Sequence, residues 1–338
     1  MNVMIKALSS HRLAVLTMLL AMHLVFVGTL AQRHLDIWQV QERYFHTWFA
    51  WVDSDYEGWS LPVPMVGGYG IGFMLLANLS AAYLTRLRWS RGKLGVHMIH
   101  LGVIALLFGE LGSSLFSKES QMRLEEGDTL NYSEDVRNWE LSFRVLAVDG
   151  EDIDVVVPRE LLKTGEAVSI QELGLEALVK DVSRPTQEVP RVEFALPGQE
   201  SVVLTGLDTQ DRELKLGGRT VLAALRHRRY YKPYALTLES FTHERYSGTS
   251  IDRLFSSLVR LRDPDHGEDK TLTISMNKPL RHKGETFYQA SYEEGGASIL
   301  QVVQNPVWWL PYLSCVLVAL GMSTHFITKF SMSRKGRP

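Results

Sequence analysis

Apolar residues form four long blocks along the chain, separated by polar segments. The blocks cover 13–31, 63–85, 94–116 and 306–328, and Glu110 in the third is the only Asp, Glu, Lys or Arg that they contain. A helix needs about 20 predominantly apolar residues to cross a hydrocarbon core about 30 Å thick. The pattern therefore predicts four transmembrane helices, at about 13–31, 66–85, 94–115 and 306–328.

The first block has a second interpretation, the apolar part of a signal peptide, because Lys6 and Arg12 precede it. The block is longer than such a segment usually is, and no cleavage site of the A-x-A kind follows Ala31. We therefore expect this helix to be retained in the membrane.

Basic residues in the short polar segments predict how the helices are oriented. Residues 85–93 hold four Lys or Arg and no acid, and so does the tail after Ile327. Residues 33–62 hold two basic residues against five acidic ones. Because short loops rich in Lys and Arg stay in the cytoplasm, both termini are predicted to be cytoplasmic. The long polar segment is then extracytoplasmic, which means periplasmic for a protein of a bacterial inner membrane.

The long polar segment, 117–304, is rich in short β-branched and aromatic runs that end at turn residues. These runs cover 141–148, 152–157, 191–196, 201–204, 234–238, 257–261, 271–276 and 299–303. Short strands at this density are typical of a β-sandwich or a barrel-like domain. The predicted fold is a membrane protein with three helices in region 1–116, a large extracytoplasmic mainly-β domain over 117–304, and a fourth helix with a basic tail over 305–338.

The external loop 33–62 is unusually aromatic, with eight Trp, Tyr or Phe side chains between Trp38 and Trp59. Such rings favour the headgroup layer of a bilayer, because one end is apolar and the other forms hydrogen bonds. The pattern favours a helix that lies on the membrane surface. A platform for a flat aromatic cofactor is the alternative. Pro62 and Pro64 are expected to end the loop.

The composition excludes several kinds of chemistry. Cys315 is the only cysteine, so the chain has no intrachain disulfide, no CxxC redox pair and no cysteine-rich metal site. The net charge of −2 averages over segments on opposite sides of the membrane and therefore indicates no partner. No P-loop, HExxH or GxSxG motif occurs. We therefore expect the β domain to be a scaffold without catalytic residues or a nucleic-acid partner.

Ionisable side chains inside the apolar blocks are better candidates for a site, because they are costly in a membrane and usually functional there. They are His23, His97, His100, Glu110 and His325. The third block also contains a glycine every seven residues, at 95, 102 and 109. On a helix these glycines form one stripe, which predicts close packing of another helix.

His97 and His100 lie one turn apart in the third block, and His100 lies deeper, about 10 Å below Lys93 at about 1.5 Å per residue. A neutral imidazole offers one ring nitrogen to a metal, and haem iron takes such axial ligands. The residues alone leave two interpretations open for both histidines, a metal ligand and a hydrogen-bond donor between helices. For His325 and Glu110, near the ends of their blocks, hydration is the simpler explanation.

Several short motifs occur in an order that resembles a known family. They are Gly28-Thr-Leu-Ala-Gln32, His100-Leu-Gly-Val-Ile104, Met276-Asn-Lys-Pro-Leu280, and 284–292 with the sequence GETFYQASY, and the tract 246–261 also resembles the segment that precedes N-x-P-L. With the layout of three helices, a large external domain and a last helix, they resemble the ResB (CcsB) family of cytochrome c biogenesis proteins.

The resemblance implies a subunit of the System II cytochrome c synthase that works with a CcsA (ResC)-type membrane partner. Such a complex is expected to carry haem b outward and present it to apocytochrome c, which makes this chain a non-catalytic or co-catalytic subunit of a haem lyase. The resemblance implies one axial haem ligand in the third helix, which His100 matches best and His97 less well, with the second ligand supplied by the partner. Asn277, Pro279, Tyr288 and Gln289 are expected to stabilise the junction between the domain and the last helix.

Two other classes of protein remain open at this point. One is a b-type electron-transfer cytochrome, which usually has paired histidines on facing helices, whereas His23 and His325 are predicted at different depths. The other is a membrane tether whose external domain binds a partner without any cofactor.

Overall fold

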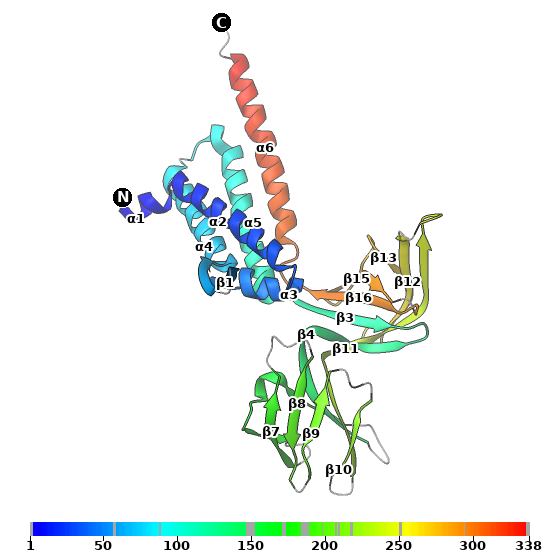
Figure 1. Cartoon of the computed structure of the whole chain (residues 1–338). Coiled ribbons are helices and arrows are strands. Elements are labelled where there is room, and N and C mark those ends of the chain that lie inside the picture. The colour runs from blue at the N-terminus through cyan, green and yellow to red at the C-terminus, as the bar shows by residue number, and fades with distance from the viewer. Residues whose placement is uncertain are drawn as a thin grey trace. The chain divides into compact units, whose positions relative to one another are not determined.

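The computed structural model describes residues 3–56, 59–87, 89–146, 153–170, 174–183, 189–197, 199–206, 208, 210–216, 219–249, 252–293 and 295–335. The chain divides into two compact units. The first, here the membrane unit, comprises Met1–Ser117 and Asn305–Pro338, and the second, the β unit, comprises Lys118–Gln304. Figure 1 shows the helices of the first and the strands of the second.

The membrane unit is mainly helical. Three helices of its described part are long and apolar enough to cross a membrane: His11–Ala31 (α2), Leu94–Phe116 (α5) and residues Leu310–Ser331 of α6, which runs over Leu310–Lys335. Further helical segments include α1 (Val3–Leu8), α4 (Gly68–Arg86) and the short η2 (Arg91–Lys93). Membrane-spanning helices were predicted from the apolar blocks, and these three agree with that prediction.

The second predicted crossing coincides with α4, which is not among the three helices that are apolar enough. Polar side chains lower its hydropathy, and they have partners within the unit. The Asn78 amide donates hydrogen bonds to the carbonyls of Leu8 and Ser10, at 2.6 and 3.0 Å, and the Tyr69 hydroxyl lies 3.0 Å from that of Ser114. The total of four crossings therefore remains a prediction.

The glycine stripe of α5 packs against α6. A methyl group built on Gly95 would lie 2.5 Å from the carbonyl oxygen of Gly321, and one on Gly102 would lie 2.7 Å from the side chain of Val318. Only glycine allows this approach, because no Cβ atom tolerates such distances. The close helix packing predicted from the seven-residue repeat is therefore confirmed.

The sequence led us to expect a surface helix in the aromatic loop, but the described part of the loop does not form one continuous helix. Helical structure is limited to α3 (Ile37–Val40) and a π-helical turn, η1 (Gln41–Phe45). The chain then forms a hairpin of β1 (Phe49–Tyr56) and β2 (Trp59–Val66), in which Pro64 pairs with Trp51. Proline is accepted here because a two-stranded sheet has only edge strands, so Pro62 and Pro64 lie within a strand and do not end the loop.

The β unit contains antiparallel strands in two sheets, counted over its described residues. A ten-stranded sheet follows the order β13-β12-β11-β4-β3-β16-β15-β14, with β5 paired to β4 and β10 to β11, and a four-stranded sheet has the order β6-β7-β8-β9. The strands are β3 (Lys118–Leu124), β4 (Thr129–Val145), β5 (Ile153–Pro158), β6 (Ala167–Ile170), β7 (Leu175–Val182), β8 (Arg191–Ala195), β9 (Val202–Thr205), β10 (Arg212–Leu216), β11 (Arg219–Arg245), β12 (Asp252–Asp263), β13 (Glu268–Ser275), β14 (Leu280–His282), β15 (Glu285–Tyr292) and β16 (Ser298–Gln304), with a short 3-10 turn η3 (Arg159–Leu161). The mainly-β character predicted for this segment is confirmed. Each predicted run lies at least partly in a strand, while residues 147, 148 and 152 lie outside the described part.

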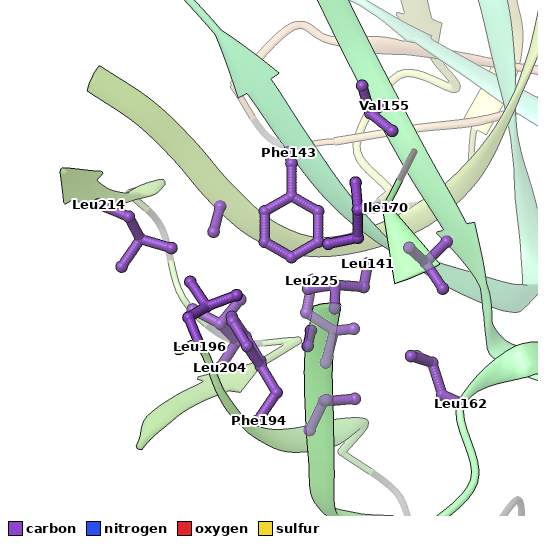
Figure 2. Packing of buried hydrophobic residues seen from close by; sticks show 14 of the residues in the cluster. Leu141, Phe143, Val155, Leu162, Ile170, Phe194, Leu196, Leu204, Leu214 and Leu225 are labelled. Carbon is purple, nitrogen blue, oxygen red and sulfur yellow. The ribbon is translucent and has the colours of Figure 1, made fainter. Parts of the chain in front are cut away.

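Two separate hydrophobic cores hold the β unit together, and the long strands β4 and β11 contribute to both. One core contains Phe143 of β4 and Phe194 of β8, whose rings meet edge to face at 5.7 Å, and Figure 2 shows it. The other contains Leu236 of β11 and Phe287 of β15, both fully buried. Alternate residues of β11 point into these cores, at Val221, Ala223 and Leu225 and again from Tyr234 to Leu238, as expected for a strand with one apolar face.

Candidate functional site

His97 on α5 is a buried imidazole without a hydrogen-bond partner. It is 4% exposed, and neither ring nitrogen has a partner among the residues that the structure describes. Aromatic rings surround it instead, with the centroid of Trp89 at 4.5 Å and that of Tyr83 at 5.6 Å. A buried polar group without a partner costs about 1–3 kcal/mol, so this histidine calls for an explanation outside the packing of the chain itself.

His100, one turn further along α5, has one ring nitrogen engaged and the other open. Its Nδ1 lies 2.9 Å from the carbonyl oxygen of Val96, and its ring is half-buried beside Tyr83. A carbonyl oxygen only accepts hydrogen bonds, so in a neutral imidazole this contact assigns the proton to Nδ1 and leaves the lone pair to Nε2. Metal-bound histidines commonly have this arrangement, because the second hydrogen bond fixes the tautomer and the ring orientation.

The other ionisable residues of the apolar blocks lie elsewhere in the membrane unit. The backbone of His325 packs against Gly95, and its ring lies 5.9 Å from that of Phe326. Glu110 is exposed near the end of α5. His23 is exposed on α2, in an apolar groove beside the hairpin. Across the described residues, no three His, Cys, Asp or Glu side chains are grouped to hold a bare metal ion.

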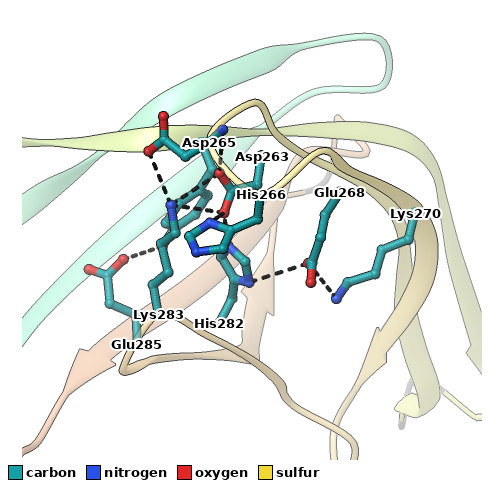
Figure 3. Close-up of polar contacts among 9 residues, drawn as sticks. Asp263, Asp265, His266, Glu268, Lys270, His282, Lys283 and Glu285 are labelled. Carbon is teal, nitrogen blue, oxygen red and sulfur yellow. Dashed lines mark hydrogen bonds and ion pairs between the residues drawn. The ribbon is translucent and has the colours of Figure 1, made fainter.

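A polar cluster in the β unit, shown in Figure 3, was not found from the sequence. Asp263 at the end of β12 is fully buried, and its carboxylate accepts hydrogen bonds from Nε2 of His282 at 3.0 Å and from Nζ of Lys283 at 3.0 Å. His266 adds a contact of 3.2 Å through Nδ1. Burial alone would raise the pKa of Asp263, but the hydrogen bonds from Lys283 and His282 outweigh it and bring this pKa down to about 2.

The turn between β14 and β15 is built around this cluster. Lys283 has φ +44°, the only positive φ at a non-glycine residue in the described chain, and Gly284 follows with φ +80°. Two successive positive φ values suit a tight turn between antiparallel strands, where Asn or Gly is usual. Lysine accepts the strain because its ammonium group reaches the buried carboxylate of Asp263.

Glu285, the next residue, anchors a second buried ion pair. It accepts hydrogen bonds from Nζ of Lys232, at 2.6 Å, and from the hydroxyl of Tyr234. The Lys232 side chain is only 3% exposed. Burial, and then the hydrogen bond to Glu285, raise the pKa of Tyr234 above its ordinary value. Tyr234 also packs edge to face on His282 at 4.6 Å, which joins the two clusters.

Gln289 on β15 adds further hydrogen bonds to these clusters. The hydrogen bonds of Asp263, Glu285 and Gln289 together are called the polar lattice here. Its carbonyl oxygen accepts from the Ser257 hydroxyl at 2.6 Å, and its amide donates to Ser298 at 3.0 Å and to the carbonyl of Ser291 at 3.2 Å. All of these partners belong to the β unit. Its amide therefore ties β12, β15 and β16 together, and the expectation that Gln289 also stabilises the junction with the last helix stays a prediction. Isolated sequence motifs could not show these hydrogen bonds, because the partners come from strands far apart in the chain.

Comparison with known proteins agrees with this arrangement. Residues 215–299, which include the Asp263 cluster and most of the Gln289 lattice, match the ResB-like family. This segment of the chain is similar to that family. It is similar to protein NrfI of Wolinella succinogenes, with 32% identity over 103 residues that cover 30% of this chain and 11% of that protein. It is also similar to two proteins named cytochrome c biogenesis protein CcsB. The relative from Synechococcus sp. (strain CC9311) is 29% identical over 204 residues, which cover 52% of this chain and 45% of that protein. The relative from Picosynechococcus sp. (strain PCC 7002) is 34% identical over 80 residues, which cover 24% of this chain and 17% of that protein.

These alignments span less than half the length of each relative. A solved structure of the cytochrome c haem lyase CcmF is 11% identical to this chain. The match covers 80% of this chain and 31% of that one. Its TM-score of 0.23 is too low to establish a common fold. The two relatives named CcsB are described as cytochrome c biogenesis proteins.

Proposed function

We propose that this ResB-like chain is a subunit of a membrane cytochrome c synthase, which carries haem b across the membrane and presents it for covalent attachment to apocytochrome c. The chain acts together with a CcsA (ResC)-type membrane subunit, in a non-catalytic or co-catalytic role. Its relatives are named for cytochrome c biogenesis, and haem is the cargo that this process requires.

The observation that carries the proposal is the contact of 2.9 Å between Nδ1 of His100 and the carbonyl oxygen of Val96. Nδ1–H donates to the carbonyl of Val96, so Nε2 is free to bind an axial position of haem iron. No other imidazole in the described part of α5 has this arrangement, because both nitrogens of His97 lack a partner. His97 is therefore the weaker ligand candidate, and we assign the haem iron to His100.

One axial ligand from this chain fits the transfer of haem better than its storage. Haem iron takes two axial ligands, and His100 offers one, its Nε2, while its Nδ1 is engaged by Val96. The partner subunit supplies the second, so the haem is held at a boundary between two subunits and is released by a change at that boundary. Haem retention by this chain alone is expected to be weak.

The positive-inside rule orients the chain in the bacterial cytoplasmic membrane. Both termini face the cytoplasm, the membrane is crossed four times by α2, α4, α5 and α6, and the β unit is periplasmic. The polar lattice around Asp263 and Gln289 makes the β unit a rigid scaffold, on the side of the membrane where apocytochrome c receives haem.

The test is the haem content of the complex. The chain is purified with its CcsA-type partner, and haem is measured by pyridine haemochrome and reduced-minus-oxidised spectra for the wild type, His100→Ala and the control His46→Ala. His46 is a suitable control because its ring pairs with Glu42 in the loop before the hairpin. We expect haem to be lost in His100→Ala and retained in His46→Ala. Equal haem in all three proteins would contradict the ligand assignment, and no haem in any of them would favour a tether.

A further inference from the structure

The structure brings together two features that lie far apart in the sequence, His23 in the middle of α2 and the hairpin of the aromatic loop. They line one groove of about 600 Å³. Leu20, His23 and Val27 form its α2 wall, and Phe49, Val52 and Met65 belong to the hairpin wall. His23 is the single polar side chain among the lining residues, so the groove is an apolar slot with one nitrogen donor.

The position of His23 is costly unless something binds to it. It lies twelve residues from the start of α2 and eight from its end, in one of the three helices apolar enough to cross a membrane. Its side chain is exposed, and no hydrogen bond to its ring is found among the described residues. An ionisable side chain in a membrane helix usually faces a partner group, because hydrocarbon offers it none.

The spacing of the α2 residues makes the wall suitable for a flat ligand. Leu20, His23 and Val27 follow one another at intervals of three and four, which places them on one helix face over about 10 Å. The opposite wall is a two-stranded sheet, whose side chains stand off a flat surface. The volume lies within the range of about 300–1,000 Å³ that is usual for cofactor pockets.

We propose that this groove is a second haem-binding site of the chain, with His23 as the axial ligand of the iron. A haem macrocycle is flat and apolar on both faces and needs an imidazole nitrogen at its iron, and the groove supplies each of these. A lipid acyl chain would fill the apolar walls but leave the imidazole without a partner. The proposal rests on the haem-carrying function given above, and it concerns a helix other than the one that carries His100.

The test distinguishes binding that needs a bond from His23 to the haem iron from binding that needs only the fit of the porphyrin ring in the groove. The full chain, with its CcsA-type partner in lipid nanodiscs, is titrated with haemin and, separately, with metal-free protoporphyrin IX. His23→Ala removes the ligand, and Val63→Trp fills the groove from β2, where Val63 is 51% exposed. His34→Ala is the matched control, because His34 is an exposed histidine just beyond the end of α2 and does not line the groove.

We expect His23→Ala to weaken haemin binding at one site by about tenfold or more and to leave the affinity for metal-free porphyrin unchanged. Val63→Trp should weaken the binding of both haemin and metal-free porphyrin. His34→Ala should leave the binding of both compounds unchanged. Wild-type affinity for haemin in both groove variants would overturn the proposal, and the groove would then hold lipid or a partner helix.

The same titration distinguishes this proposal from the proposed function. If only His100→Ala loses haem, the groove site is wrong and the role of His100 stands. If only the groove variants lose haem, the assignment of His100 is wrong and the groove site stands. If no variant loses haem, both are wrong.

Discussion

The polar clusters of the β unit and the histidines of α5 differ in how their polar atoms are bonded. In the β unit, buried groups such as Asp263, Glu285 and Gln289 are tied into dense sets of hydrogen bonds. In the membrane unit, His97 is buried with both nitrogens unpaired among the described residues, and His100 keeps one nitrogen open. Polar groups with partners contribute to stability, whereas polar groups without them reduce it. The difference means that these clusters contribute to the stability of the β unit, whereas the histidines of α5 have ring nitrogens without a hydrogen bond in the described chain.

Close packing of α5 against α6 contributes to the stability of the membrane unit. The largest effect is expected for Gly95→Ala, because its new methyl group would lie 2.5 Å from backbone atoms of both Gly321 and His325. Backbone atoms cannot rotate away, so α5 and α6 must separate, at a cost of about 3 kcal/mol. Thermal unfolding of the full chain in detergent measures this.

Gly72→Ala on α4 is the matched control, since no atom lies within 4 Å of the methyl group that it adds. It should be neutral or stabilising by up to about 1 kcal/mol. Similar melting temperatures for the two variants would show that the α5–α6 contact is not as close as described.

The next effect concerns the buried carboxylate of the β unit. Asp263→Asn removes the closer and buried counterion of the Lys283 ammonium, and the melting temperature of the full chain should fall by several degrees. Asp265→Asn is the control, because Asp265 is an exposed residue that contacts the same ammonium at a longer distance, 3.4 Å. An equal fall in melting temperature in both variants would show that Asp263 contributes no more to stability than the exposed Asp265.

The pH dependence of this contribution follows from the sign of the shift. The pKa of Asp263 in the folded protein, about 2, is below the ordinary value of 3.8. The ionised carboxylate therefore stabilises the fold fully above pH 3.8, and this contribution is lost as the pH falls from 3.8 toward about 2. The difference in stability between the wild type and Asp263→Asn should shrink over that interval. A difference that does not vary with pH would contradict the shift.

A smaller loss is expected for Gln289→Ala. It leaves the buried hydroxyls of Ser257 and Ser298 without the amide that now binds both, which should cost about 2 kcal/mol. Tyr288→Phe, at the neighbouring and half-exposed position of β15, should change stability little. Chemical unfolding curves of the two variants give the comparison, and an unaffected Gln289→Ala would mean that the lattice is not needed for stability.

The smallest effect, and the sharpest contrast with the β unit, is expected for His97→Phe. Because neither nitrogen of His97 has a partner within the described chain, an apolar ring of similar shape should leave stability unchanged or raise it by up to about 1 kcal/mol. A clear loss of stability would show that the His97 nitrogens are bonded in the folded protein and that the two units do not differ in this respect.

The parts of the molecule that could be predicted from the sequence are those encoded in local patterns. Apolar length marked α2, α5 and α6, the glycine repeat marked the face of α5 that meets α6, and β-branched runs marked the strands. The β1–β2 hairpin was missed because its aromatic residues and prolines also fit an interfacial loop.

The polar clusters could not be predicted because they depend on strand pairing between distant segments. Asp263 and His282 meet only because β12, β13 and the β14–β15 turn bring them together, and nothing in their spacing marks the contact. Val96 lies one helical turn before His100, so the helix brings the two residues together. Whether the hydrogen bond forms depends on the side-chain rotamer of His100, which the sequence does not specify. The groove of His23 needs the hairpin, so it could not be anticipated either.

The most direct test of the central claim is the spectrum of a His100→Gly variant, purified with its CcsA-type partner and measured with and without added imidazole. The small residue leaves space in which free imidazole can replace the missing ring. We predict that the low-spin haem spectrum disappears in the variant and returns when imidazole is added. A low-spin spectrum that persists without imidazole, or haem that is lost and not recovered with it, would contradict axial ligation by His100.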